Sequence, residues 1–466
     1  MESDKLIGEI TDYCRKAGVA ESTFGRIVVN DGKFVNRLRD GGRITTMTLD
    51  RVRSFLSAEP ALKGRAARGL LLERAPASLP VAAPAQPFNY AARPARDFRF
   101  FDNRQKYLLF VNTCSEKAVV AQRVAMELTN IHPRPPAVRL FDAGIGDGTV
   151  LTRVMRALHN RFSTMPFYIV GKEISVEDVR LALEKMSDRF FEHPATVLVI
   201  TNLNYLEAPW LVPNSMAAAS SMVWHEVALT GKTSHDFDEQ ITALEPFLAE
   251  NWRVNVNAAS GNPTYERPAV LVIYREDHRF LLEPVIPRRG STAADYDLVV
   301  ASQPYRARAP IEFKAARVLA PLAKSLGPGG RLLAIHSHGN DAGLEILRGI
   351  WPAESPFQHD RHQTLKAVKE ALGSAARDLN FNAYSDTRSL FRYEMHALPS
   401  EIVASIGTST LFAAWNAAIY VGQVEDARLE DAIGDRRYLN VTRDVLRKHG
   451  GLWFWDESFI VSRHRD

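Results

Sequence analysis

The spacing of apolar residues divides the chain into three parts. In residues 1–58, apolar residues recur at helical spacing between glycines, and Thr48 is placed to cap the last segment. This part is predicted to hold four short helices, at residues 5–17, 20–28, 33–39 and 48–57. Residues 59–97 are rich in Ala, Pro and Arg and cannot bury a core, so we expect a linker. Residues 98–466 return to regular apolar spacing and are expected to form the main domain.

Within the main domain, apolar runs typical of strands alternate with segments of helical periodicity. Strands are expected at residues 138–143, 167–172, 197–201, 296–301, 331–335 and 452–462. Helices are expected after the first two strands, at residues 149–160 and 176–190. This alternation predicts an α/β fold with a mostly parallel sheet, in which ligands bind at the carboxyl ends of the strands.

A long segment, residues 207–295, separates the third predicted strand from the fourth. We expect helices at residues 223–229 and 234–251 and a hairpin at residues 270–285. An insertion at this point starts at the carboxyl edge of the sheet. It is therefore expected to form a lid or a wall of the site.

Composition narrows the class of protein. The chain is 46% hydrophobic and 24% charged, which is typical of soluble domains. Its apolar runs are too short to span a membrane and its N-terminus does not resemble a secretion signal, so we expect a cytoplasmic protein with no membrane partner. Two cysteines, Cys14 and Cys114, cannot make a disulfide framework or a thiolate zinc site. His336 and His338, or His359 and His362, are too few for a metal site, and none is expected.

The first strand of the main domain is followed by a glycine-rich turn, Asp142-Ala-Gly144-Ile-Gly146-Asp-Gly148. Its third glycine comes one residue earlier than in the G-x-G-x-x-G turn that binds a dinucleotide. The carboxylate of Asp142 would also lie badly beside a pyrophosphate. The turn therefore predicts a ligand that carries positive charge and no phosphate, and S-adenosylmethionine has both properties.

The stretch FDAGIGDGT resembles the first motif of the class I S-adenosylmethionine-dependent methyltransferases, and the resemblance covers about residues 98–338. It implies a Rossmann-like, seven-stranded, mostly parallel sheet, accompanied here by a small all-α N-terminal domain. It also implies that Gly144, Gly146 and Gly148 allow the backbone to approach the cofactor. Asp142 is then expected near the methionine amino group.

The ends of the next two strands carry further residues that the resemblance assigns to the cofactor. Glu173 stands where the family places an acid that accepts both ribose hydroxyls. Asn202 stands where an acidic residue often contacts the adenine amino group, and its amide oxygen is expected to accept the same hydrogen bond. Asn204 is the competing candidate for this contact.

The fourth strand ends in Ser302-Gln303-Pro304-Tyr305, which is similar to the [Asn/Asp/Ser]-Pro-Pro-[Tyr/Phe] signature of methyltransferases that act on planar amino groups. In that signature a side-chain oxygen and a backbone carbonyl accept hydrogen bonds from the target, and the aromatic ring stacks on it. Ser302, Pro304 and Tyr305 fit these roles, whereas Gln303 departs from the pattern. Methyl transfer depends mainly on placement and needs no dedicated base. Candidate bases are His336, His338, and His225 with Glu226.

The order of segments in residues 1–58 resembles the helix-turn-helix domains of the λ-repressor-like type. The resemblance implies that residues 33–39 form a recognition helix, and a DNA role would favour a homodimer. It would place four side chains toward DNA and one on a phosphate: Lys33, Asn36, Arg37 and Arg39, and Arg43. The alternative is a helical cap with solvated arginines.

These observations predict a methyltransferase that uses S-adenosylmethionine. A small-molecule acceptor is expected over nucleic acid, with an amino group as the candidate target. Residues 1–97 hold 16 Lys and Arg against 11 Asp and Glu, so the chain's net charge of +4 leaves no basic surplus in the rest. Two alternatives stay open: a DNA-binding regulator that senses S-adenosylmethionine, and a nucleic-acid amino-methyltransferase.

Overall fold

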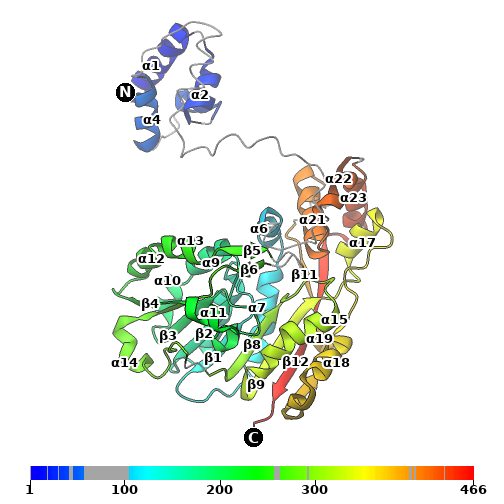
Figure 1. The fold of residues 1–466 in the computed structure, drawn as a ribbon. Helices are drawn as coiled ribbons and strands as arrows, with labels where there is room; N and C mark the ends of the chain where they lie inside the picture. Colours follow the sequence, from blue (N-terminus) through cyan, green and yellow to red (C-terminus); the bar gives the residue numbers. More distant parts are fainter. Residues whose placement is uncertain are drawn as a thin grey trace. The chain divides into compact units, whose positions relative to one another are not determined.

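The computed structural model of the chain describes residues 2–17, 19–29, 31–40, 46–56, 104–256, 263–290, 293–397, 401–402, 406–434 and 436–465. These residues belong to two compact units, Met1–Arg93 and Pro94–Asp466, each taken by itself here (Figure 1). The expected linker at residues 59–97 lies outside the described residues.

The N-terminal unit contains the four expected helices. They are α1 (Glu2–Ala17), α2 (Glu21–Val29), α3 (Phe34–Arg39) and α4 (Thr46–Leu56). Their apolar faces meet in one core, where the rings of Tyr13, Phe24 and Phe55 pack edge to face with centroids 5.6–5.8 Å apart. Helix α4 begins at Thr46, so Thr48 lies within the first turn and is not the N-cap.

The larger unit is built on one sheet of ten strands, where seven were expected. Their order is β10-β12-β9-β8-β1-β2-β3-β7-β4, and β11 pairs with β12 (Figure 1). The strands are β1 (Val138–Asp142), β2 (Phe167–Lys172), β3 (Thr196–Thr201), β4 (Val223–Leu229), β7 (Ala269–Arg275), β8 (Tyr296–Ser302), β9 (Leu326–Ser337), β10 (Leu379–Asn382), β11 (Leu390–Glu394) and β12 (Trp453–Arg463). Strands β3, β2, β1, β8 and β9 are mutually parallel, and β12 is antiparallel to β9.

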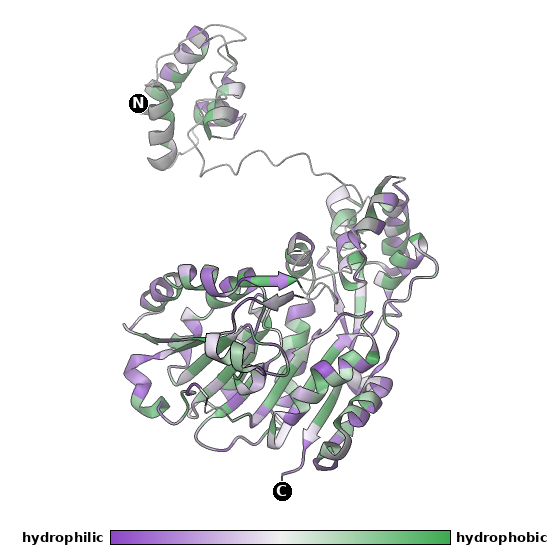
Figure 2. Ribbon diagram, in the orientation of Figure 1, coloured by the Kyte–Doolittle hydropathy of each residue, from purple (hydrophilic) through white to green (hydrophobic). Residues whose placement is uncertain are grey.

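Alternate residues of the central strands pack against two different helical layers. Leu140 and Ile169 belong to a core with helices α7–α10, α12 and α13, whereas Phe141 and Val170 belong to a core with η4, α16 and α18. Side chains of a strand point alternately to its two faces, so both faces of this sheet are covered. Figure 2 shows the apolar residues concentrated on these strands.

The helices of the two layers have the following bounds. They are α7 (Glu116–Glu127), α8 (Thr149–Arg161), α9 (Val176–Leu183), α10 (Ser187–Glu192), α12 (Ser234–Thr242), α13 (Glu245–Asn251), α15 (Ile311–Phe313), η4 (Lys314–Leu319), α16 (Ala320–Lys324) and α18 (Arg361–Leu372). The helix expected at residues 176–190 is thus two helices, α9 and α10. Shorter elements are η2 (Ala208–Trp210), α11 (Met216–Ser221), η3 (Glu276–His278), α14 (Arg279–Leu282), η5 (Gly373–Asp378) and α19 (Asp386–Ser389).

A third apolar core joins the beginning of the larger unit to its end. It contains helices α6 (Arg104–Thr113), α17 (Ala342–Ile350), α21 (Thr408–Val421), α22 (Asp426–Gly434) and α23 (Arg437–His449). Within it the rings of Phe110 and Tyr420 lie 4.8 Å apart. This packing places Tyr107 and Tyr420 side by side, although they are more than 300 residues apart in the sequence.

The inserted segment differs from the prediction in two places. Residues 223–229 form strand β4 and not a helix, because they pair along their whole length with β7. Residues 270–285 form β7, η3 and α14 and not a hairpin. Strand β7 pairs antiparallel with β3, so the insertion extends the sheet. A separate small hairpin joins β5 (Val254–Val256) to β6 (Pro263–Tyr265). Among the described residues, no helix is long and apolar enough to cross a membrane.

Candidate functional site

A cavity of about 690 Å³ opens at the carboxyl ends of the parallel strands. Gly144 follows β1, Glu173 follows β2, Asn202 follows β3, and Ser302 and Ser337 end β8 and β9. Its walls are completed by Tyr107 and Tyr420 of the third core, by Gln423 after α21, and by Pro263–Tyr265 of the small hairpin. The cavity size is within the range of about 300–1,000 Å³ that is common for small-molecule sites.

The glycine-rich turn contributes to this cavity through two of its three glycines. Gly144 and Gly146 line the cavity, whereas Gly148 and Asp142 do not. A Cβ atom on Gly144 would meet nothing within 4 Å, so its backbone faces open space. Gly148 has a φ of +78°, and a Cβ there would lie 2.7 Å from the Cα of Ala182 in α9. Gly148 is therefore needed for helix packing against the turn.

We expect Gly148→Ala to destabilise the larger unit by roughly 2–5 kcal/mol, because it combines a left-handed backbone with an overlap against Ala182. Gly144→Ala is the matched control and should change stability little. Urea unfolding followed by tryptophan fluorescence measures this, since all 7 tryptophans lie in the larger unit. Equal stability of the two variants would contradict this account of the turn.

Asp142 lies beneath the turn and holds its shape. Its side chain is only 5% exposed, and its Oδ1 accepts a hydrogen bond from the Gly144 amide at 3.2 Å. Burial raises the pKa of Asp142 to about 6, although the bond from Gly144 and the charge of Lys117 oppose this. The carboxylate thus fixes the backbone of the turn through this hydrogen bond.

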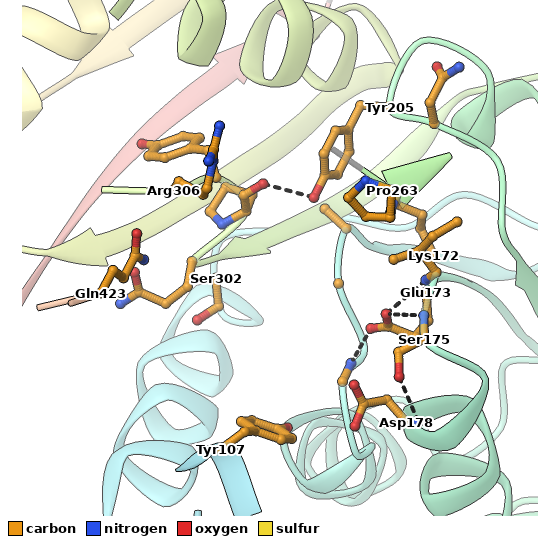
Figure 3. A pocket seen from close by; sticks show the side chains of 18 of the residues that line it. Tyr107, Lys172, Glu173, Ser175, Asp178, Tyr205, Pro263, Ser302, Arg306 and Gln423 are labelled. Atoms are coloured by element: carbon orange, nitrogen blue, oxygen red, sulfur yellow. Dashed lines mark hydrogen bonds between the residues drawn. The ribbon is translucent and has the colours of Figure 1, made fainter. Parts of the chain in front are cut away.

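The carboxylate of Glu173 lies on one wall of the cavity, where three backbone amides hold it (Figure 3). Its Oε1 accepts from Ile174 at 2.7 Å and Ser175 at 2.9 Å, and its Oε2 accepts from Gly146 at 3.0 Å. The indole of Trp252 donates to the Glu173 carbonyl at 2.9 Å. A carboxylate has about four acceptor positions, so Oε2 keeps one for a ligand hydroxyl.

Four other charged side chains line this end of the cavity, and the sequence alone did not single them out: Glu116, Lys117, Lys172 and Asp178. Lys117 lies 3.4 Å from a carboxylate oxygen of Glu116 and 5.5 Å from the ring centre of Tyr107. Burial alone would lower the pKa of Lys117, but the charge of Glu116 raises it well above its usual value. Burial and the charge of Glu173 raise the pKa of Asp178 to about 7. The sequence offers a signal only for Asp178, an acid in the first turn of α9.

Asn202 lines the cavity, but its side-chain amide already makes three hydrogen bonds to the protein backbone. Its oxygen accepts from the Ala269 amide at 2.8 Å, and its nitrogen donates to the carbonyls of Asn251 at 3.2 Å and Arg267 at 2.9 Å. Asn202 thereby joins β3 to the inserted segment. Asn204 also lines the cavity and is more exposed, with its oxygen accepting from the Leu206 amide at 2.9 Å.

The loop at residues 302–305 lines the opposite wall, and its polar groups are largely paired within the protein. The Pro304 carbonyl accepts from the Tyr205 hydroxyl at 2.8 Å. Gln303 has a φ of +47°, which a proline ring cannot adopt. Its side-chain amide nitrogen donates to the Ser337 hydroxyl at 3.1 Å and to the Asp456 carboxylate at 3.2 Å. The departure from the signature at this position thus gives the loop a different shape.

Tyr305 lines the cavity but is only 6% exposed, because its hydroxyl points into a buried chain of hydrogen bonds. The hydroxyl lies 2.8 Å from Nδ1 of His336, and Nε2 of His336 lies 2.8 Å from Glu457. Glu457 also accepts from Arg361 at 3.1 Å. Of the predicted bases, His336 alone is hydrogen-bonded to a residue of the cavity wall.

The other candidate bases lie elsewhere. His338 is 3.6 Å from Glu457, and its pKa is raised chiefly by its hydrogen bond to that carboxylate. His225 stacks on Phe247 outside the cavity lining, and Glu226 accepts from the Tyr274 hydroxyl at 2.6 Å. In the part of the chain that the structure describes, no group of three or more His, Cys, Asp and Glu side chains could hold a metal ion.

The expected recognition helix of the N-terminal unit is α3. Lys33 and Asn36 are exposed there. Arg37 pairs with Asp31 and Arg39 with Glu21, each at 2.6 Å, so two of the expected DNA-facing cations have partners within the unit. Arg43 lies outside the described residues. DNA binding through this unit stays a prediction.

No family model matches the sequence, and no curated protein matches it. The chain is similar to solved structures of methyltransferases. One is assigned as a sarcosine dimethylglycine methyltransferase from Galdieria sulphuraria, at 10% identity and a TM-score of 0.31, over 75% of this chain and 86% of that one. Another is a geranyl diphosphate methyltransferase in complex with GPP and sinefungin, at 11% identity and a TM-score of 0.30, over 75% and 78%.

PKMT2 from Rickettsia typhi in complex with AdoHcy is similar at 10% identity and a TM-score of 0.25, over 74% of this chain and 52% of that one. Likeness at this level assigns no family. The function proposed below therefore rests on the residues of the site itself.

Proposed function

We propose that the chain binds S-adenosylmethionine in this cavity and transfers its methyl group to a second molecule. The observation that carries the proposal is the position of the Glu173 carboxylate. The amide of Gly146 in the glycine-rich turn holds it. Glu173 and the segment that follows β3 line the same cavity. A fixed carboxylate with one free acceptor position suits a ribose hydroxyl, and the nearby carboxylates of Glu116 and Asp178 suit a cationic ligand without phosphate.

The proposed contacts of the cofactor follow from the side chains that line this end. Gly144 and Gly146 allow close approach of the backbone, and the ammonium of Lys117 is suited to the methionine carboxylate. For the adenine amino group we propose Asn204 over Asn202, because the amide of Asn202 is already paired with three backbone groups. The cofactor supplies a methyl group on a sulfonium, which makes transfer to a nucleophile favourable.

The remaining wall offers space for an acceptor, and this favours catalysis over simple sensing of the cofactor. Ser302, Ser337 and Gln423 line the cavity beyond Glu173, and a sensor would not need them. Such a wall holds the acceptor at the methyl group, and placement is a large part of catalysis for this displacement. The hydrogen bond between the Tyr305 hydroxyl and His336 connects this wall to a candidate general base.

The acceptor is proposed to be a small molecule. The predicted role of Pro304 requires its carbonyl to accept a hydrogen bond from the target amino group, but this carbonyl already accepts from the Tyr205 hydroxyl. The proposal therefore does not include an amino group as the acceptor. A cytoplasmic location and homodimer formation stay predictions.

Calorimetric titration of the full chain with S-adenosylhomocysteine tests the proposal, with NAD as the control ligand. We expect micromolar binding of S-adenosylhomocysteine and none of NAD, because the turn has the wrong spacing for a pyrophosphate. Absence of S-adenosylhomocysteine binding would refute the cofactor assignment. Accumulation of S-adenosylhomocysteine from S-adenosylmethionine and a metabolite extract distinguishes an enzyme from a sensor.

Affinity for S-adenosylmethionine is expected to rise with pH between about 5 and 8. The pKa of Asp142 is raised to about 6 and that of Asp178 to about 7, so both carboxyls lose their negative charge as the pH falls through this window. A cation should bind more weakly to the neutral forms, by up to about tenfold per pH unit for one linked proton. Titrations across the window measure the slope, and Asp178→Asn should reduce it. A flat profile in the wild-type protein would contradict the linkage.

A further inference from the structure

The charged side chains of the cavity are divided between its two walls. Its three lining carboxylates, Glu116, Glu173 and Asp178, all lie in the part of the chain before β3. Among the described lining residues from Asn202 onward, there is no Asp or Glu, and the charged side chains are Arg306 and Arg317. The charged side chains of the acceptor wall are thus all cationic, whereas the cofactor wall carries these three carboxylates and two lysines, Lys117 and Lys172.

Arg317 differs from other arginines nearby, which are paired with carboxylates. Arg308 pairs with Glu354, and Arg361 pairs with Glu457 and Asp386. Arg317 is exposed on η4, and no ion pair or hydrogen bond joins it to another described residue. Its charge is therefore available to a ligand.

The local structure presents these cations to the cavity. Arg306 follows the Ser302–Tyr305 loop, and Figure 3 places it on the same side as Ser302 and Gln423, across from Glu173 and Asp178. Arg317 lies in a π-helical turn, Lys314–Leu319, and such turns are frequent at functional sites. Phe313 lies four residues before Arg317 and also lines the cavity.

The positive charge of the methyl donor, S-adenosylmethionine, limits which acceptors can bind beside this wall. A sulfonium cation next to two guanidinium groups would repel a cationic acceptor. A neutral acceptor would leave the charge of Arg317 without a counter-charge. A carboxylate or phosphate matches the planar donors of arginine and can bind them in pairs. The rings of Tyr305 and Phe313 on the same wall provide a flat apolar surface for the body of such a molecule.

We infer that the methyl acceptor is an organic acid with a flat apolar body, whose carboxylate or phosphate binds Arg306 and Arg317 on the wall opposite Glu173. This inference rests on the proposed function for the identity of the donor. The anion site itself belongs to the chain and can be measured without turnover.

Fluorine NMR titration of the full chain, saturated with S-adenosylhomocysteine, tests the inference. The probes are para-fluorobenzoate, para-fluorophenyl phosphate, para-fluorobenzyl alcohol and para-fluorobenzylammonium, which share the ring and differ in charge. We expect at least one of the two anions to bind at least about tenfold more tightly than the alcohol, and the ammonium to bind most weakly. The tighter of the two anions identifies the acidic group as carboxylate or phosphate.

Arg306→Gln and Arg317→Gln should each weaken binding of the preferred anion at least about tenfold, while the affinity for S-adenosylhomocysteine stays unchanged. Arg377→Gln is the matched control, because Arg377 is an exposed arginine outside the cavity lining and its loss changes the net charge equally. Equal binding of the four probes, or equal anion affinity in Arg317→Gln and Arg377→Gln, would overturn the inference. If S-adenosylhomocysteine does not bind, the proposed function is refuted, and the same titration without it still measures the anion site.

Discussion

Glu173→Ala is expected to lower the affinity for S-adenosylhomocysteine by about 10-fold to 150-fold. A hydrogen bond to a charged group contributes roughly 1.5–3 kcal/mol, and the Glu173 carboxylate keeps one acceptor position for a ribose hydroxyl. The substitution also removes the acceptor for the amides of Gly146, Ile174 and Ser175, which loosens the glycine-rich turn. Calorimetry should therefore show a higher Kd for S-adenosylhomocysteine in this variant.

Two variants separate the carboxylate's role from general effects. Glu173→Gln retains one side-chain oxygen without the charge and should show an intermediate affinity. Glu184→Gln removes an exposed acid outside the cavity lining and should bind like the wild-type protein. Tryptophan fluorescence should show that each variant is folded. Wild-type affinity in a folded Glu173→Ala protein would falsify the assignment of the ribose site.

Glu457→Ala is expected to destabilise the larger unit by about 3–5 kcal/mol, because it removes one member of a buried ionic network. Glu457 is only 1% exposed and binds His336 at 2.8 Å and Arg361 at 3.1 Å. Burial alone would raise the pKa of Glu457, but its hydrogen bonds to His336, His338 and Arg361 lower it well below the usual range. Without the carboxylate, the guanidinium of Arg361 keeps the carbonyls of Ala383 and Tyr384 and a single carboxylate partner, Asp386, which is largely exposed.

The measurement is urea unfolding followed by tryptophan fluorescence, with Glu394→Ala as the control. Glu394 lies on the neighbouring strand β11 and forms an exposed pair with Arg392, so its loss should cost less than about 1 kcal/mol. Because the folded pKa of Glu457 is lowered, its contribution is present above the unfolded pKa near 4.5 and is lost as the pH falls below it. Equal free energies of unfolding for the two variants would show that the network adds no stability.

The differences between prediction and structure are concentrated where distant segments pair. Residues 223–229 carry a pattern compatible with either a helix or an edge strand, and only their pairing with β7 makes them a strand. The amide of Asn202 follows β3 as predicted, yet its bonds are decided by the inserted segment, through Ala269, Asn251 and Arg267. Tyr305 lies on the predicted wall, but its hydroxyl is directed by His336 on β9.

The sequence by itself determined where strands β1, β2, β3, β8 and β9 lie along the chain. It also determined the glycine-rich turn and the place of Glu173 at the end of β2. These features depend on local periodicity, on backbone angles open to glycine, and on the rule that parallel strands end at one edge of a sheet. Tertiary structure alone decided the ten-stranded sheet and the wall made by Tyr107, Tyr420 and Arg317. The physical reason is that side-chain contacts between segments hundreds of residues apart depend on packing, which leaves no periodic trace in either segment.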